Sequence, residues 1–234
     1  MAHPRVLALD FVGTLAGHGP APGGLLVADV LRGLPGTVIP EEFAARFDTV
    51  TQQVRRYDRG VRSTFATRLR RAARDCGALV PSLRLATEAV FTALPDARVD
   101  PAAAEALRQL HARGLVCVLA ANTDRPEGVR LRTLQDAGIG DCFDAVVLSS
   151  TLGFRKPDPR FYVAVTRAAD CRPEEVLFVG DNVETDALAP HQCGMSAVLV
   201  TSGPRPAVLP PGIATVPHLS RLAAHLNSLG CAAG

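Results

Sequence analysis

Lysine is nearly absent from this chain. Of its 25 basic residues only Lys156 is a lysine, and all the others are arginines. Arginine presents a planar fork of donors whereas lysine carries a compact point charge, so a site that needs the compact ammonium cannot use arginine instead. The single lysine stands in a Gly-Phe-Arg-Lys-Pro-Asp-Pro stretch, and Lys156 is therefore the first candidate functional residue. The alternative interpretation is that Lys156 is an ordinary surface lysine on a solvated loop, without a role in function.

Three further features are missing. The six cysteines form no Cys-x-x-Cys pair and several lie in apolar stretches such as 116–118, which predicts reduced core thiols in a cytoplasmic protein. No segment reaches about 18 uninterrupted apolar residues, and Asp10 interrupts the first apolar run, so neither a membrane span nor a signal peptide is predicted. The net charge of +2 is too small to argue for nucleic acid as a partner.

Short apolar runs alternate with amphipathic segments of helical length. Strands are expected at 6–9, 115–121, 145–148, 176–179 and 197–200, and helices at 101–113 and 160–169 among the segments between them. Strands that alternate with helices predict an α/β fold with a parallel sheet covered on both faces. In such sheets ligands bind beyond the carboxyl ends of the strands.

About 85 residues after the first strand contain no convincing strand pattern. We interpret residues 17–95 as an inserted helical cap, and residues 1–16 with 96–234 as the catalytic core. Helices are expected in the cap near 24–34, 41–58, 61–77 and 82–94, where apolar residues recur at helical spacing. The proline-rich segment 203–212 is expected to be irregular, with a last short helix near 219–229.

Four polar motifs lie at the ends of predicted strands. They are Asp10-Phe11-Val12-Gly13-Thr14, Ala121-Asn122, Lys156-Pro157 and Gly180-Asp181-Asn182-Val183-Glu184-Thr185-Asp186. Their order and spacing resemble the haloacid dehalogenase-like (HAD) hydrolase superfamily over most of the chain. The resemblance implies a Rossmann-like parallel sheet with an inserted helical (C1-type) cap. Asparagine occurs only three times in the chain, and two of these, Asn122 and Asn182, fall in the motifs.

The resemblance also implies a role for each motif residue. Asp10 would be the nucleophile, and a carboxylate attacking phosphorus or carbon forms a covalent intermediate that water then opens. Asp10, Asp181 and the main-chain oxygen of Val12 would share Mg²⁺, a cation that prefers oxygen ligands. Lys156 would stabilise developing negative charge. Asn122 would contact the transferred anion, and Thr14 would fix the turn around the nucleophile. Asp186 would orient Lys156 or a metal-bound water.

Two positions depart from the family's phosphatases. Val12 stands where they carry a second aspartate that acts as general acid and base, a function worth about 10²–10⁴ in rate. Ala121 stands where the family usually has a serine or threonine hydroxyl, and a lost hydrogen bond to a charged group costs about 1.5–3 kcal/mol. Ordinary phosphomonoesterase activity is therefore not expected.

Three functions stay open. The preferred one is a HAD-like hydrolase with an aspartate nucleophile and Mg²⁺, acting on an activated phosphate or another substrate whose leaving group needs no general acid, in specialised metabolism for instance. The second is a catalytically impaired HAD-like protein with a binding or regulatory role. The third is a 2-haloacid dehalogenase, whereas phosphonoacetaldehyde hydrolase, which needs a cap lysine, is disfavoured because the predicted cap contains none.

The predicted cap is rich in arginine. Arg55, Arg56, Arg59, Arg62, Arg68, Arg70, Arg71 and Arg74 lie close together in sequence. Arginine forks suit carboxylate and phosphate groups, so a small anionic substrate is expected, although a solvated helix face would have the same composition. The sequence indicates no oligomeric state.

Overall fold

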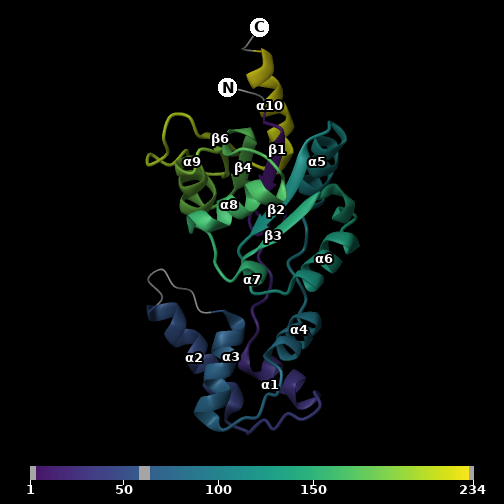
Figure 1. Cartoon of the computed structure of the whole chain (residues 1–234), viewed down its shortest axis with the longest axis vertical. Helices are drawn as coiled ribbons and strands as arrows, with labels where there is room; N and C mark the ends of the chain where they lie inside the picture. Colours follow the sequence, from purple (N-terminus) through teal and green to yellow (C-terminus); the bar gives the residue numbers. More distant parts are fainter. Residues whose placement is uncertain (1–3, 58–63, 232–234) are drawn as a thin grey trace. The chain divides into compact units, whose positions relative to one another are not determined.

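The computed structural model describes residues 4–57 and 64–231, without the side chains of 55–57 and 229–231. The chain forms two compact units (Figure 1). The sheet unit contains Met1–His18, Ala97–Thr123 and Leu131–Gly234, and the helical unit contains Gly19–Asp96 and Asp124–Arg130. The chain therefore passes between the units four times. No sequence pattern led us to expect residues 124–130 in the helical unit.

The sheet unit is built on six parallel strands in the order β3-β2-β1-β4-β5-β6. They are β1 (Val6–Leu9), β2 (Val116–Ala121), β3 (Ala145–Leu148), β4 (Val176–Gly180), β5 (Ser196–Val200) and β6 (Ala214–Val216). The predicted α/β class with a Rossmann-like parallel sheet is confirmed. Strand β6 was not predicted, because three residues are too few to show a periodic pattern.

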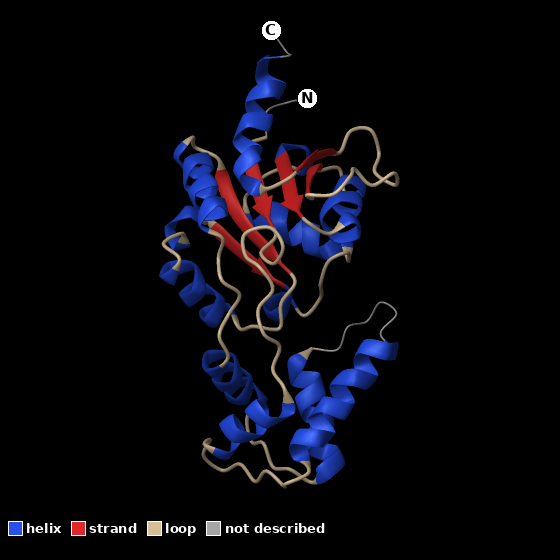
Figure 2. Cartoon of the chain, turned by 180° about the vertical axis from the view of Figure 1, so that it is seen from behind, coloured by secondary structure: helices blue, strands red, loops and turns tan. Residues whose placement is uncertain are grey.

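Alternate residues of the central strands point to opposite faces, as the period of two requires. Leu7 and Leu9 of β1 pack in one apolar cluster, which includes Leu107 of α5 (Pro101–Ala112) and Leu222 of α10 (Leu222–Cys231). Val6 and Ala8 pack in a second cluster with residues of α8 (Pro159–Ala168). Both faces are therefore buried, which explains the unbroken apolar runs (Figure 2).

Capping residues fix the starts of two helices in the sheet unit. The Asp100 carboxylate accepts the N–H of Ala103 at 2.8 Å at the start of α5, and the Asp158 carboxylate accepts the N–H of Arg160 at 2.9 Å at the start of α8. Further helical segments of the sheet unit include α7 (Ser149–Leu152), α9 (Ala189–Gln192) and the π-helical turn η3 (Val183–Leu188), whereas α6 (Glu127–Asp136) begins in the helical unit and ends in the sheet unit. No helix among the residues described is both long and apolar enough to cross a membrane.

The helical unit has its own apolar core. Its helices are α1 (Gly24–Arg32), α2 (Phe43–Tyr57), α3 (Phe65–Cys76) and α4 (Leu83–Ala93). Phe47 and Phe65 pack with their ring centroids 5.6 Å apart, and Phe65 packs edge-on against Phe91 at 5.0 Å. Gly24 lies so close to α2 that a Cβ would come within 2.0 Å of the Ala44 carbonyl oxygen. The predicted apolar spacing therefore corresponds to helix packing.

A buried ionic cluster joins two parts of the helical unit that are distant in sequence. Asp96 accepts Arg125 Nε at 2.9 Å and Arg130 Nη1 at 2.7 Å. The side chains of both arginines are almost fully buried, at 7% and 3% exposed. Residues 124–130 also supply Val129 to the apolar core of this unit. Charge pairing and apolar packing together explain why this segment groups with the helices.

We expect Asp96→Ala to destabilise the protein strongly, because it leaves two buried guanidinium groups without their carboxylate. Removing one partner of a buried pair costs about 3–5 kcal/mol. Asp29→Ala is the matched control, because Asp29 and Arg32 form an exposed pair whose loss costs about 1 kcal/mol or less. Chemical denaturation measures both free energies of unfolding, and equal losses would contradict a structural role for the buried cluster.

Candidate active site

The first motif residue, Asp10, leaves the sheet at the carboxyl end of β1. Its N–H still donates to the Val179 carbonyl of the neighbouring strand at 2.9 Å, so the position of Asp10 is fixed by the sheet. The chain then turns sharply, with the N–H groups of Leu15 and Ala16 both donating to the Phe11 carbonyl at 2.9 Å. This places the carboxylate at the edge where α/β sheets bind ligands.

Gly13 lets that turn approach the fourth motif. Its φ of +84° favours glycine, and a Cβ there would come within 2.2 Å of the Asp181 carboxylate. Asp181 directly follows β4, which pairs with β1 in register from Val6 to Leu9. The absence of a side chain at Gly13 thus allows Asp181 to lie beside the turn that carries Asp10.

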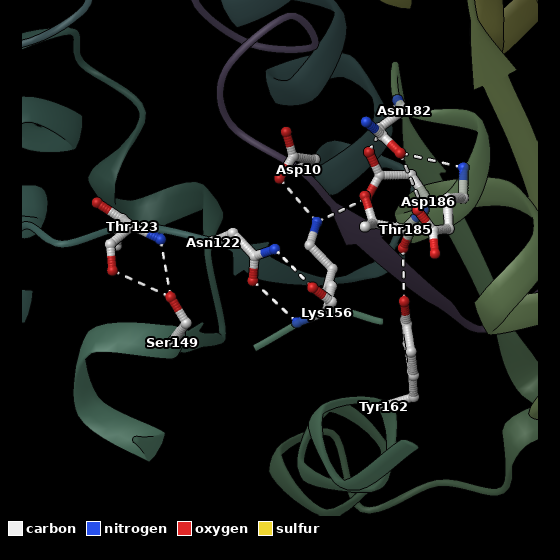
Figure 3. Close-up of polar contacts among 10 residues, drawn as sticks. Asp10, Asn122, Thr123, Ser149, Lys156, Tyr162, Asn182, Thr185 and Asp186 are labelled. Atoms are coloured by element: carbon white, nitrogen blue, oxygen red, sulfur yellow. Dashed lines mark hydrogen bonds and ion pairs between the residues drawn. The ribbon is translucent and has the colours of Figure 1, made fainter. Parts of the chain in front are cut away.

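Lys156 connects the first and fourth motifs (Figure 3). Its Nζ donates to Asp10 Oδ1 at 2.8 Å and to Asp186 Oδ1 at 2.6 Å, and the residue is only 2% exposed. The ammonium also lies 5.0 Å from the centroid of the Phe178 ring, within the range of cation–π attraction. Two carboxylates and an aromatic face surround it, so a planar guanidinium would not fit without displacing them.

Both carboxylate oxygens of Asp186 accept hydrogen bonds from its neighbours. Its Oδ1 accepts Lys156 and also the Thr185 hydroxyl at 3.2 Å, while its Oδ2 accepts the N–H of Asn182 at 3.0 Å. Asn182 in turn accepts the N–H groups of Glu184 and Thr185 and so caps η3. This carboxylate is thereby aimed at the lysine.

Tyr162 is a site residue that the sequence interpretation missed. Its hydroxyl donates to the Thr185 carbonyl at 2.6 Å, so α8 holds the turn that carries Asp186 (Figure 3). Burial, together with the charge of Asp186, raises the pKa of Tyr162 and keeps the phenol protonated as a donor. A tyrosine six residues after Lys156 gives only a weak signal in one sequence, because helical aromatic residues usually serve packing.

Asn122 contacts the main chain of Lys156. Its amide donates to the Lys156 carbonyl at 3.0 Å, and its Oδ1 accepts the Lys156 N–H at 2.9 Å. The next N–H, that of Thr123, donates to the Ser149 hydroxyl at 2.9 Å, and the same hydroxyl donates to the Thr123 carbonyl. The end of β2 therefore positions the lysine, whereas the predicted contact of Asn122 with an anion stays a prediction.

The electrostatics of the site reflect the burial of its charged groups and, after that, an excess of carboxylates over cations. Burial raises the pKa of Asp10 to about 6; Lys156 opposes this shift and Asp186 adds to it. Burial and then the charge of Asp186 raise the pKa of Asp181. Burial alone would lower the pKa of Lys156, but Asp10 and Asp186 outweigh it and the net direction is upward. Lys156 is therefore an ammonium, and the carboxylates repel one another.

Asp10, Asp181 and Asp186 could hold a cation together. Each offers an oxygen, and these oxygens all lie within 4.8 Å of one another. Asp181 is exposed, whereas Asp186 is buried and already bonded to Lys156. Asp10 and Asp181 are therefore the carboxylates better placed to take a further positive ligand.

The remaining predicted positions, Thr14, Val12 and Ala121, have different surroundings in the structure. The Thr14 hydroxyl is buried and has no hydrogen-bond partner among the residues described, and main-chain hydrogen bonds hold the turn around Asp10, so the expected role of Thr14 stays a prediction. Val12 is half-buried against the apolar core, and Ala121 is 2% exposed. Neither side chain can replace the acid or the hydroxyl that the resemblance associates with these positions.

Several arginines of the helical unit already lie near carboxylates, so fewer of them are available to bind an anion than their number suggests. Arg68 pairs with Asp124 at 2.9 Å, and Arg71 and Arg74 approach Asp75. Arg59 and Arg62 lie outside the described residues, as do the side chains of Arg55 and Arg56. The structure therefore adds no support to an anion-binding role for this stretch.

Comparison with known proteins identifies the class. The family model for haloacid dehalogenase-like hydrolases matches residues 4–194, and the chain belongs to this family. The chain is 32% identical over 137 residues to a phosphoserine phosphatase from Thermus thermophilus, an alignment that covers 58% of this chain and 54% of that protein. The chain spans about half the length of the curated relatives it matches.

Solved structures share the fold over nearly the whole chain. A 2-haloacid dehalogenase from Pseudomonas syringae superposes with a TM-score of 0.65 at 19% identity, covering 97% of this chain and 99% of that chain. The HAD hydrolase YfnB from Bacillus subtilis, bound to magnesium, superposes with a TM-score of 0.62 at 18% identity, covering 96% and 99%. Relatives and neighbours of this chain thus include both phosphatases and dehalogenases.

We expect Lys156→Met to destabilise the protein more at pH 8 than at pH 5. The pKa of Asp10, already about 6, will rise further without the ammonium. The folded state then binds a proton at Asp10 more tightly than the unfolded chain, so stability is lost as the pH rises through the folded pKa. At pH 8 the loss in the free energy of unfolding should approach about 3–5 kcal/mol, the cost of breaking a buried ion pair.

Denaturation in the presence of a chelator at both pH values measures this difference. Arg160→Met is the control, because Arg160 pairs with Asp158 at the surface and its loss should matter little at either pH. A loss for Lys156→Met that does not depend on pH would show that packing, and not charge, accounts for the effect.

Proposed function

We propose that the protein is a HAD-like hydrolase that uses Asp10 as nucleophile, with Mg²⁺, on a small anionic substrate whose leaving group needs no protonation. The observation that carries the proposal is the Asp10–Lys156–Asp186 arrangement, with Val12 two residues after the nucleophile. The helical unit would act as the cap of this site.

The site residues fit a divalent cation. Three carboxylates and one ammonium leave a formal charge of about −2, and burial, followed by the charge of Asp186, raises the pKa of Asp181. Asp10, Asp181 and the main-chain oxygen of Val12 would hold Mg²⁺, which prefers oxygen ligands. Bound there, the ion would supply positive charge that stabilises negative charge on the transferring group. YfnB, which shares the fold, was crystallised with magnesium.

The chemistry requires two displacements at one atom. In the first, a carboxylate oxygen of Asp10 forms a bond to phosphorus while the bond to the leaving oxygen breaks, and the leaving group departs with the electron pair. In the second, water attacks the phosphorus of the aspartyl phosphate, the bond to Asp10 breaks, and the water proton passes to solvent. Lys156 keeps Asp10 oriented and balances negative charge in both steps.

Several features of the site disfavour an ordinary phosphate ester as the substrate. Val12 offers no proton to a leaving alkoxide, and Ala121 offers no hydroxyl to a phosphoryl oxygen. The amide of Asn122 is bonded to Lys156, and the N–H of Thr123 to Ser149, so two more donors near this strand end are already engaged. An acyl phosphate suits such a site, because its carboxylate leaving group is a weak base.

The same details favour a second candidate, a binding or regulatory protein without turnover. It would keep the metal site and the lysine but lack the groups that complete the reaction. The intact network between Asp10, Lys156 and Asp186 favours the enzyme, since a lysine buried between two carboxylates is costly to maintain without use.

We expect metal-dependent hydrolysis of acetyl phosphate, faster than that of p-nitrophenyl phosphate. Asp10→Asn should lower the rate by at least roughly 10³-fold, because it removes the nucleophile. Phosphate release and the intact mass of the protein are followed with Mg²⁺ or with chelator. The exposed Asp141 provides the control, and Asp141→Asn should leave turnover unchanged.

Other outcomes separate the alternatives. A stoichiometric phosphoryl adduct without turnover would show that Asp10 attacks but that water is not activated, as in an impaired protein. Chloride release from 2-chloropropionate, lost in Asp10→Asn, would identify a dehalogenase, because halide leaves without a proton. No product and no adduct from any of these substrates would favour the binding role.

We expect Val12→Asp to increase hydrolysis of an alkyl phosphate, because it provides a carboxyl group to protonate the leaving oxygen. The gain should be about 10²-fold, the low end for positioned proton transfer, since the surroundings of residue 12 are not adapted to it. Val12→Asn is the matched control, similar in size to aspartate but unable to act as the acid. Equal rates for the two variants would show that the missing acid does not limit the reaction.

A further inference from the structure

The turn after β1 brings the following residues back beside the first motif. The N–H of Gly13 donates to the Ala16 carbonyl at 2.7 Å. Ala16 also forms β-bridges with Val12 on one side and with Val99 on the other, so its position is fixed within the sheet unit. Two residues of extended chain span at most about 7 Å, so the main chain of His18 lies within that distance of Ala16.

His18 lies near the Asp181 carboxylate and belongs to the same unit. The turn itself touches that carboxylate, because a Cβ at Gly13 would come within 2.2 Å of it. Burial is the main cause that raises the pKa of Asp181, and the charge of His18 opposes this shift across the short separation. The exposed His18 ring forms no hydrogen bond or ion pair within the part of the chain that the structure describes. Both ring nitrogens are therefore available to a molecule bound at the site.

The second displacement of the proposed reaction releases a proton from water, and most groups of the site cannot accept it. Lys156 is an ammonium without a lone pair, and Asp186 is buried with both carboxylate oxygens already bonded. Asp181 would be a metal ligand, and Val12 is apolar. Among the described residues whose charges act on the site carboxylates, this leaves His18 as an unbonded group with a basic nitrogen.

We propose that His18 is a further catalytic residue, the general base that takes a proton from the water of the second displacement. This inference rests on the proposed function. The water oxygen forms a bond to phosphorus, the bond from phosphorus to Asp10 breaks with its electron pair returning to the carboxylate, and the water proton passes to a ring nitrogen of His18. The exposed ring then releases that proton to solvent. The first displacement uses no base, so only the second step depends on His18.

His18→Gln separates the two steps, because glutamine keeps a polar side chain but cannot accept the proton. The protein is mixed with acetyl phosphate and Mg²⁺, and intact mass follows the phosphoryl adduct as it forms and as it decays after acetyl phosphate is removed. Decay should be about 10²-fold slower than in the wild type, the low end for positioned proton transfer, while formation stays within about twofold. His191→Gln is the matched control, since His191 is an exposed histidine of α9; both of its rates should equal those of the wild type.

A measurement without metal or substrate tests the placement of the ring separately. In NMR spectra of the metal-free protein, the imidazole signals of His18 should shift in Asp181→Asn, whereas those of His191 should not. Unchanged His18 signals, or adduct decay at the wild-type rate in His18→Gln, would overturn the inference while the proposed function stands. Equal slowing of formation and decay would also overturn it, since a structural defect affects both steps. If the wild type forms no adduct and releases no phosphate, the proposed function fails and the inference fails with it.

Discussion

The site depends on one buried ammonium between two carboxylates. Lys156 joins Asp10 at the end of β1 to Asp186 in η3, and without it three carboxylates would face one another at the sheet edge. Burying such charges is favourable only if they are paired with good geometry and their remaining bonding capacity is satisfied. Much of the surrounding structure meets that condition: Asn122 holds the lysine main chain, Asn182 and Thr185 bond Asp186, and Phe178 lies beside the ammonium.

The sequence predicted the parts of this site that local pattern determines. Apolar runs located the five longer strands, and because parallel strands end at one edge, the motif residues that follow them were expected to converge. The structure brings Asp10, Lys156, Asp181 and Asp186 together there, and Asn122 beside Lys156. Their chemical roles rest on the family resemblance, since proximity alone does not distinguish a nucleophile from a structural ion pair.

Other features depended on tertiary packing that one sequence does not show. The bond from Tyr162 to the Thr185 carbonyl joins a helix to a turn, and neither residue type indicates the other. The hydroxyl of Ser149, 26 positions from Thr123, binds a main chain whose position depends on the whole sheet. Residues 124–130 follow a core strand in sequence yet group with the helices, because Asp96 and the carbonyls at the end of α4 accept the hydrogen bonds of Arg125. Such pairings arise from folding itself and leave no periodic signal.

The changes at Val12 and Ala121 leave the charge-balancing part of the site intact while removing groups that serve a protonated leaving group and a phosphoryl oxygen. These two parts are physically separable. The ion pairs fix the carboxylate of Asp10 and hold positive charge beside it, whereas in the proposed reaction an acid would set which leaving groups can depart. Under the function proposed above, a site that keeps the first part and lacks the second would be restricted to bonds that break without proton transfer, so the leaving group, more than the transferred group, would determine what this protein hydrolyses.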